Sequence, residues 1–205
     1  MTGPKERKER ALGMALQLKA YRSLSPKSAL SRRGTRPGMQ GTKRQRRSGS
    51  DFLKQIKEKQ KFKLSYGIDE RTLRRIFTEA KRSGGNVGDK LWELLESRLD
   101  NAVFRSGLAP SRGVARQLVR HGHIILNGKR VKSPGCLVAV KDIIGIYEYS
   151  KERAPFHEIG ERLGVGDVSS WLTVNKDTKT ATVIATPREE QPQFEVNLLV
   201  ESFSK

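Results

Sequence analysis

The sequence predicts an α+β protein in which a basic N-terminal helical domain precedes a module of two short helices and a small, mainly antiparallel sheet. Apolar residues recur at helical spacing from residue 51 to 80 and from 91 to 107. An Asn-Gly pair at 127–128 separates two short runs, which is the strongest short-range sign of a β-hairpin. Basic residues gather before both features, with 19 Lys or Arg against 4 Asp or Glu in residues 1–65.

Residues 1–50 are predicted to form a basic extended tail. Their apolar positions are scattered, and SPKSALSRRGTRPGMQGTKRQRRSGS is rich in Arg, Lys, Gly, Ser and Pro. Such a segment cannot bury enough apolar area to offset its chain entropy. We expect it to become ordered only against an anionic partner, although a solubilising tail or an import signal would have the same composition.

Residues 51–90 are predicted to form the helical domain. The run FLKQIKEKQKFKLSYG forms a first helix that Gly67 ends, and DERTLRRIFTEAKRSGG forms a second that Asp69 caps. Both helices keep a basic outer face. We expect the apolar C-terminal residues 190–205 to fold back on them and complete the domain.

Residues 91–189 are predicted to form the module. LWELLESRLDNAVFRSG is typical of one core helix, with Asp100 on its outer surface. Ser111 caps the helix RGVARQLVRHG, and Gly122 closes it. The hairpin and further strands are expected at 124–131, 137–140, 143–147, 171–174 and 180–185, with a short helical connection at 151–164.

The overall charge favours a nucleic acid as partner. A net charge of +19 on 205 residues creates a field that attracts polyanions. The single cysteine, Cys136, excludes an internal disulfide and any zinc site built from several cysteines. No run approaches the roughly 18 to 20 apolar residues that cross a bilayer. We therefore expect no metal, no cofactor, no membrane and no obligate homo-oligomer.

The second helix of the module carries the strongest candidate RNA contacts. Arg112, Arg116 and Arg120 are four residues apart, so they share one face, and each can bind a phosphate bidentately. Lys129 and Lys132 in the hairpin would act as point charges. A single exposed arginine is as often a solvated surface residue, but three in register beside a hairpin favour RNA binding.

Other polar residues are weaker candidates for contacts with RNA. Ser111 and Gln117 could reach sugar or phosphate oxygens, and Tyr66, expected to be exposed, could stack on a base. The histidines could equally cap or pack, and Asn127 is explained by the turn alone. The candidate RNA-binding residues are Lys43, Arg44, Arg46, Arg47, Lys54, Lys59, Lys61, Lys63, Tyr66, Arg71, Arg74, Arg75, Ser111, Arg112, Arg116, Gln117, Arg120, His121, His123, Asn127, Lys129, Arg130 and Lys132.

Longer runs carry a family resemblance. They are RPGMQGTKRQRR, EKQKFKLSYGIDERTLRRIF, GNVGDKLWELLESRLDNAVFRSGLAPSRGVARQLVRHGHIILNGKRV, WLTV and LLVESFSK, in this order. With them the chain resembles the family of the fourth protein of the small ribosomal subunit, in its bacterial or organellar form. The central run alone would indicate only the small RNA-binding module named after that family, and it is the order of all the pieces that is specific.

The resemblance implies a structural constituent of the small ribosomal subunit. Family members are primary binders of small-subunit ribosomal RNA, nucleate assembly and lie near the mRNA entry path beside the third and fifth small-subunit proteins. They contribute to translational accuracy, and the expected location is the cytoplasmic ribosome or its organellar equivalent. Some members hold zinc with four N-terminal cysteines, which this chain lacks.

Two alternatives come from other classes of protein. A free RNA chaperone or translational regulator would also carry a long basic tail. A pseudouridine synthase would use the aspartate of an Arg-Leu-Asp triplet, present here as Arg98, Leu99 and Asp100. That triplet lies inside the module's own first helix, and the chain after the hairpin is too short for a synthase domain. We therefore predict no catalytic residue.

Overall fold

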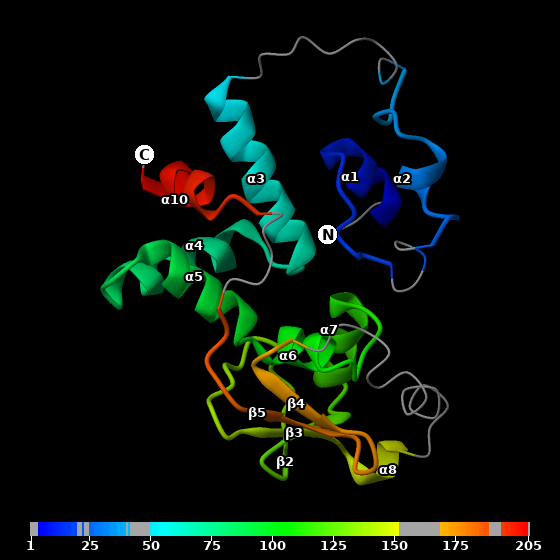
Figure 1. The fold of residues 1–205 in the computed structure, drawn as a ribbon, viewed down its shortest axis with the longest axis vertical. Helices are drawn as coiled ribbons and strands as arrows, with labels where there is room; N and C mark the ends of the chain where they lie inside the picture. The colour runs from blue at the N-terminus through cyan, green and yellow to red at the C-terminus, as the bar shows by residue number, and fades with distance from the viewer. Residues whose placement is uncertain are drawn as a thin grey trace. The chain divides into compact units, whose positions relative to one another are not determined.

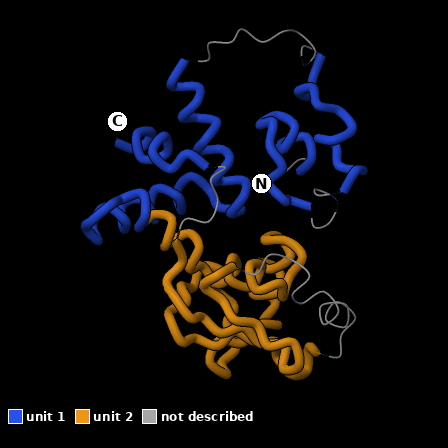
Figure 2. Tube along the Cα trace, viewed as in Figure 1, with its two compact units in different colours: residues 1–90, 191–205 blue, residues 91–190 orange. Residues whose placement is uncertain are grey.

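The computed structural model describes residues 4–19, 22, 25–39, 41, 50–151, 169–188 and 194–204 (Figure 1). The chain divides into two compact units, shown in blue and orange in Figure 2. Unit 1 comprises residues 1–90 and 191–205, and unit 2 comprises residues 91–190. Among the described helices, none combines the length and the apolar character needed to cross a membrane.

The N-terminal segment contains two helices, α1 (Lys5–Leu12) and α2 (Ala29–Arg32). The buried carboxylate of Glu9 accepts hydrogen bonds from the backbone amides of Leu16 and Leu18, each at 3.1 Å. The expectation of an extended tail is therefore wrong for this part. The chain folds there around polar contacts with a buried acid, which a search for apolar periodicity does not detect.

The helical pair of unit 1 forms at the predicted places, as α3 (Asp51–Ser65) and α4 (Glu70–Arg82). Asp69 caps α4 by accepting from the amide of Thr72 at 2.8 Å, and hydrogen bonds from the side chain and then the backbone amide of Thr72 lower the pKa of Asp69. Leu73, Ile76 and Phe77 form the buried stripe of α4, as helical spacing predicts.

The C-terminal helix α10 (Val196–Ser204) packs against α3 and α4. The rings of Phe194 and Phe62 lie 4.8 Å apart, and those of Phe203 and Phe77 lie 5.1 Å apart. The buried Glu58 accepts from the backbone amide that precedes α10, at 2.8 Å. Aromatic packing and this hydrogen bond join the C-terminal helix to α3 and α4 within unit 1.

The predicted core helix at 91–107 is in fact two helices, α5 (Val87–Glu96) and α6 (Leu99–Arg105). The chain extends at Arg98, which forms a β-bridge with Leu137. The amides of Leu99 and Asp100 donate to the carbonyls of Cys136 and Pro134, at 2.7 and 3.1 Å. Carbonyls of a distant loop therefore accept hydrogen bonds from the first amides of α6. Helical periodicity in the sequence cannot reveal such a break between two helices.

The second helix of the module, α7 (Arg112–Arg120), has the predicted ends. The Ser111 hydroxyl accepts from the amide of Val114 at 3.3 Å, and Gly122 follows the helix with a φ of +72°. Both predictions, the serine cap and the closing glycine, are confirmed.

One antiparallel sheet joins the described strands in the order β2-β1-β3-β5-β4. Asn127 and Gly128 turn the chain between β1 and β2 with φ values of +50° and +78°, as a type I′ hairpin requires. The predicted strand at 137–140 is wrong, since it contributes only the bridge to Arg98. The elements are β1 (Ile124–Leu126), β2 (Lys129–Arg130), β3 (Ile143–Ile146), α8 (Glu148–Lys151), β4 (Leu172–Asn175) and β5 (Thr180–Val183).

The core of unit 2 lies between α6, α7 and one face of the sheet. Val103, Val119, Ile124 and Ile144 are wholly buried in one cluster, and Trp171 joins them. This packing makes the helix pair and the hairpin a rigid support for the side chains on the outside. Apart from Lys151, the helical connection expected at 151–164 lies outside the described residues.

Candidate nucleic-acid interface

An exposed basic surface covers the end of α7 and the adjoining hairpin. The α7–hairpin face is defined by Gln117, Arg120, His121, Lys129, Arg130 and Lys132, all of which are exposed. The Nε of Arg130 donates to the carbonyl of Gly122 at 3.0 Å. A Cβ placed on Gly122 would lie 3.4 Å from Cε of Lys132. The hairpin cations therefore lie against the C-terminal end of α7, where the helix dipole favours positive charge.

Arg112 does not belong to this face, because its side chain is only 9% exposed. Its Nε donates to Oδ1 of Asn101 at 2.8 Å, and its guanidinium stacks over the ring of Phe104. The prediction that Arg112 projects with its neighbours is wrong, since the start of α7 faces the core and its end faces solvent. Ser111 is likewise buried and its hydroxyl caps the helix, so it is not open to RNA.

Arg116 lies between these extremes, with 29% of its side chain exposed. Its Nε and Nη2 both donate to Oδ2 of Asp100, at 3.0 and 2.7 Å. Asp100 is only 3% exposed and also accepts two hydrogen bonds from Arg98. The expectation that Asp100 is a surface residue is wrong. It is a buried acid that holds two arginines.

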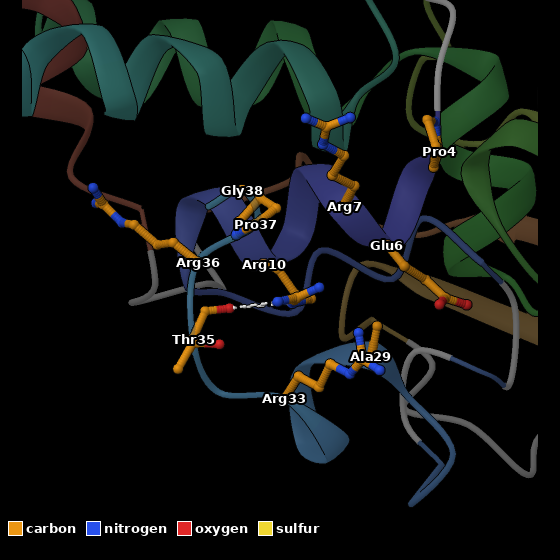
Figure 3. A pocket seen from close by; sticks show the side chains of 10 residues that line it. All are labelled: Pro4, Glu6, Arg7, Arg10, Ala29, Arg33, Thr35, Arg36, Pro37 and Gly38. Atoms are coloured by element: carbon orange, nitrogen blue, oxygen red, sulfur yellow. Dashed lines mark hydrogen bonds between the residues drawn. The ribbon is translucent and has the colours of Figure 1, made fainter. Parts of the chain in front are cut away.

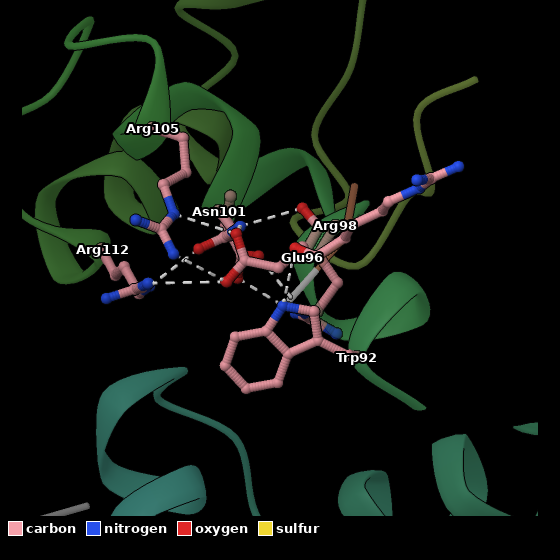
Figure 4. A network of polar contacts seen from close by, with 8 residues as sticks. Trp92, Glu96, Arg98, Asn101, Arg105 and Arg112 are labelled. Atoms are coloured by element: carbon pink, nitrogen blue, oxygen red, sulfur yellow. Dashed lines mark hydrogen bonds and ion pairs between the residues drawn. The ribbon is translucent and has the colours of Figure 1, made fainter. Parts of the chain in front are cut away.

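A second buried acid, Glu96, organises the neighbouring polar network (Figure 4). It accepts from Nε and Nη2 of Arg105 at 2.9 and 3.1 Å, and from the amide of Asn101 at 2.8 Å. Nη2 of Arg112 lies 3.8 Å from the same carboxylate. Because Glu96 belongs to α5, Asn101 to α6 and Arg112 to α7, the network joins three helices. Buried charges need such partners, since an unpaired charge in the core is costly.

The lysines of α3 are mostly paired within unit 1. Lys59 and Lys63 lie 3.1 and 2.9 Å from the carboxylate of Glu70, and Lys61 lies 2.6 Å from that of Glu58. Burial alone would raise the pKa of Glu70, but the hydrogen bonds from Lys63 and Lys59 outweigh it and lower the pKa. These lysines hold α3 to α4 and to their own helix, so they are weaker phosphate ligands than the sequence suggests.

The outer face of α4 carries three exposed arginines. Arg71, Arg74 and Arg75 are exposed and share one side of the helix through their spacing. Lys54, on α3, is exposed beside Asp51, whose hydrogen bond raises the pKa of Lys54. The α4 arginines are the best candidates for phosphate contacts in this unit.

Three further candidates have structural roles. Tyr66 is 3% exposed and stacks on Phe62 at 6.3 Å, so the prediction of an exposed stacking residue is wrong there. Asn127 donates to Asp142 at 2.8 Å and accepts from the amide of Ile143, which fixes the hairpin turn. His123 is half-buried, and its Nδ1 lies 2.9 Å from the Ser150 hydroxyl in a hydrogen bond.

A hollow of about 420 Å³ lies between α1, α2 and the loop that follows α2 (Figure 3). Four arginines line it, and Arg10 donates to the carbonyl of Thr35 at 2.8 Å. Arg7 and Arg36 point in different directions, so the hollow is not a cage for one small anion. A hydrogen bond from Lys19 lowers the pKa of Glu6, at its rim. The predicted contacts at Lys43, Arg44, Arg46 and Arg47 lie outside the described residues.

Tyr149 is an exposed aromatic residue that was not among the predicted candidates, and its exposed fraction is 79%. The sequence feature that could have indicated it is the pair Tyr147 and Tyr149, which directly follows the apolar run of the predicted strand. Among the described residues, no group of three or more His, Cys, Asp or Glu could hold a metal ion.

Comparison with known proteins identifies the family. A model described as Ribosomal protein S4/S9 N-terminal domain matches residues 1–96, and one described as S4 domain matches residues 97–144. A protein of Gloeobacter violaceus named Small ribosomal subunit protein uS4 is 44% identical over 206 residues, which cover 100% of this chain and 98% of the relative. The chain belongs to the uS4 family.

A second uS4 relative agrees with the first. The protein of that name from Syntrophomonas wolfei is 44% identical over 195 residues, which cover 94% of this chain and 93% of the relative. The predicted family resemblance is thus confirmed, and so is the α+β fold class, a helical N-terminal part followed by an S4 module.

Proposed function

We propose that this protein is a structural, non-catalytic constituent of the small ribosomal subunit and binds its ribosomal RNA. The observation that carries this proposal is the full-length identity of 44% to a protein named uS4. The exposed basic surfaces support it, because phosphate contacts supply most of the affinity of such proteins for RNA.

The α7–hairpin face is suited to folded RNA rather than to a base sequence. Paired RNA hides its major groove, so proteins recognise it through shape, phosphates and sugar hydroxyls. Arg120 and Arg130 can bind phosphates bidentately, and the lysines Lys129 and Lys132 add point charges. The network around Glu96 and Asp100 keeps α7 in place, so that little order has to be created on binding.

The finer role follows from the same proposal. Unit 1 offers the α4 arginines and unit 2 the α7–hairpin face, and two such faces on one chain suit a junction of several RNA helices. We propose that the protein binds the upstream domain of the ribosomal RNA early, nucleates assembly and contributes to translational accuracy. Its proposed neighbours are the third and fifth small-subunit proteins and the mRNA at its entry path, in a cytoplasmic ribosome.

Binding of the purified chain to the two ribosomal RNAs tests the proposal. We expect tighter binding to small-subunit RNA than to large-subunit RNA at the same salt concentration, and a footprint within the upstream domain. Filter binding across a salt series and chemical probing measure both. Equal affinity for the two RNAs would contradict the proposal and favour a general RNA chaperone.

A further inference from the structure

Three planar side chains lie next to one another beside the end of β3: Arg130 of β2, Tyr147 directly after β3, and Tyr149 of α8. The guanidinium carbon of Arg130 lies 4.3 Å from the ring centre of Tyr147. The ring of Tyr149 lies 5.6 Å from that of Tyr147, with 41° between their planes. Tyr149 is 79% exposed, so its ring contributes little to the core of unit 2.

The backbone that presents Tyr149 is held firmly. The amide of Tyr147 donates to the carbonyl of His123, and that of Ser150 donates to the carbonyl of Tyr147, both at 2.8 Å. Ser150 is 3% exposed and its hydroxyl is bonded to the ring of His123. The short helix α8, drawn in yellow in Figure 1, is therefore fixed to the end of the sheet. An exposed ring on a fixed backbone loses little freedom when it stacks on a ligand.

The chemistry of this site fits an unpaired nucleobase. Bases that have left a helix stack on exposed aromatic rings, and arginine planes extend such a stack. Arg130 belongs both to this row and to the α7–hairpin face, so it can meet a phosphate while it supports Tyr147. The ring of His121 stacks on that of His123 at 6.2 Å, and His123 is hydrogen-bonded to Ser150, the neighbour of Tyr149. The guanidinium of Arg130 in this row favours an RNA ligand, whose phosphate it can also bind, over a protein partner.

We propose that Tyr149 stacks on an unpaired base of the ribosomal RNA, with Tyr147 and Arg130 as its supports. This inference deepens the proposed function and rests on it. Both tyrosines lie beyond residue 144, where the match to the S4 domain model ends, whereas Arg130 lies within the matched residues.

Three substitutions at Tyr149 test the site in the full-length protein. Tyr149→Ala should weaken binding to small-subunit ribosomal RNA about 5- to 150-fold, which is the range for one stacked base. Tyr149→Phe keeps the ring and should bind like the wild type, whereas Tyr149→Leu keeps apolar area without a ring and should behave like the alanine variant. The log-log dependence of affinity on salt should not change, because no charge is removed.

Chemical probing of the bound RNA provides the second readout. We expect the reactivity of one unpaired base to rise in the Tyr149→Ala complex, with the rest of the footprint retained. Unchanged affinity and an unchanged footprint would overturn the inference, and so would a loss that appears only in assembled subunits, which would indicate a protein contact. If the wild type itself fails to prefer small-subunit RNA, the proposed function fails instead, so the two failures are distinguishable.

Discussion

At the scale of single residues, three arginines of one helix face have three different roles. Arg112 is buried and bonded to Asn101, Arg116 is half-exposed and held by Asp100, and Arg120 is exposed. Their spacing of four predicts a shared face, but α7 enters the core at its start and leaves it at its end. Sequence spacing gives the direction of a side chain about the helix axis, and burial by other elements decides what the side chain can bind.

Arg112 and Arg120 provide a matched pair of substitutions on α7. Arg112→Ala should lower the free energy of unfolding by about 3 kcal/mol or more, because it removes a partner from the buried Glu96 and Asn101. Arg120→Ala should change it by less than about 0.5 kcal/mol, since the side chain is exposed. Urea denaturation measures both.

The same pair should give the opposite result in RNA binding. Arg120→Ala should reduce the log-log slope of affinity against salt by roughly 0.7 to 0.9, the loss of one phosphate contact, while folded Arg112→Ala should keep the slope. A stable Arg112→Ala variant with a reduced slope would show that Arg112 meets phosphate after all.

At the scale of elements, local signals in the sequence were reliable and long-range ones were not. The caps at Asp69 and Ser111 and the Asn-Gly turn depend on neighbouring residues, and all three are confirmed. The break between α5 and α6 depends on carbonyls at Pro134 and Cys136, far along the chain. The fold of the chain after α1 depends on the buried Glu9, which composition alone presents as one more charge in a polar tail.

The two basic helices of unit 1 should contribute unequally to RNA binding. The double variant Arg74→Ala with Arg75→Ala should reduce the log-log slope of affinity against salt by the amount expected for about two phosphate contacts. Both side chains are exposed on α4. The control removes the same charge from α3, as Lys59→Ala with Lys63→Ala. Since Glu70 already pairs with these lysines, the slope should fall by less than the amount expected for one phosphate contact. Equal losses in the two variants would mean that RNA displaces Glu70.

At the scale of the whole molecule, one chain carries two exposed basic surfaces, the α4 arginines in unit 1 and the α7–hairpin face in unit 2. The helical unit closes on itself through α10, and the module is held by its own core and by the acids Glu96 and Asp100. We propose that the two units act as two domains of an RNA clamp. The family resemblance predicted the binding of ribosomal RNA from ordered motifs, whereas the exposure of the individual basic side chains is visible only in the structure.

The most direct test of the central claim is the sedimentation of the full-length protein from its host. In a sucrose gradient that separates the ribosomal subunits, nearly all of the chain should travel with the small subunit and remain there after a moderate salt wash. Recovery of most of the protein at the top of the gradient would contradict the assignment to the ribosome.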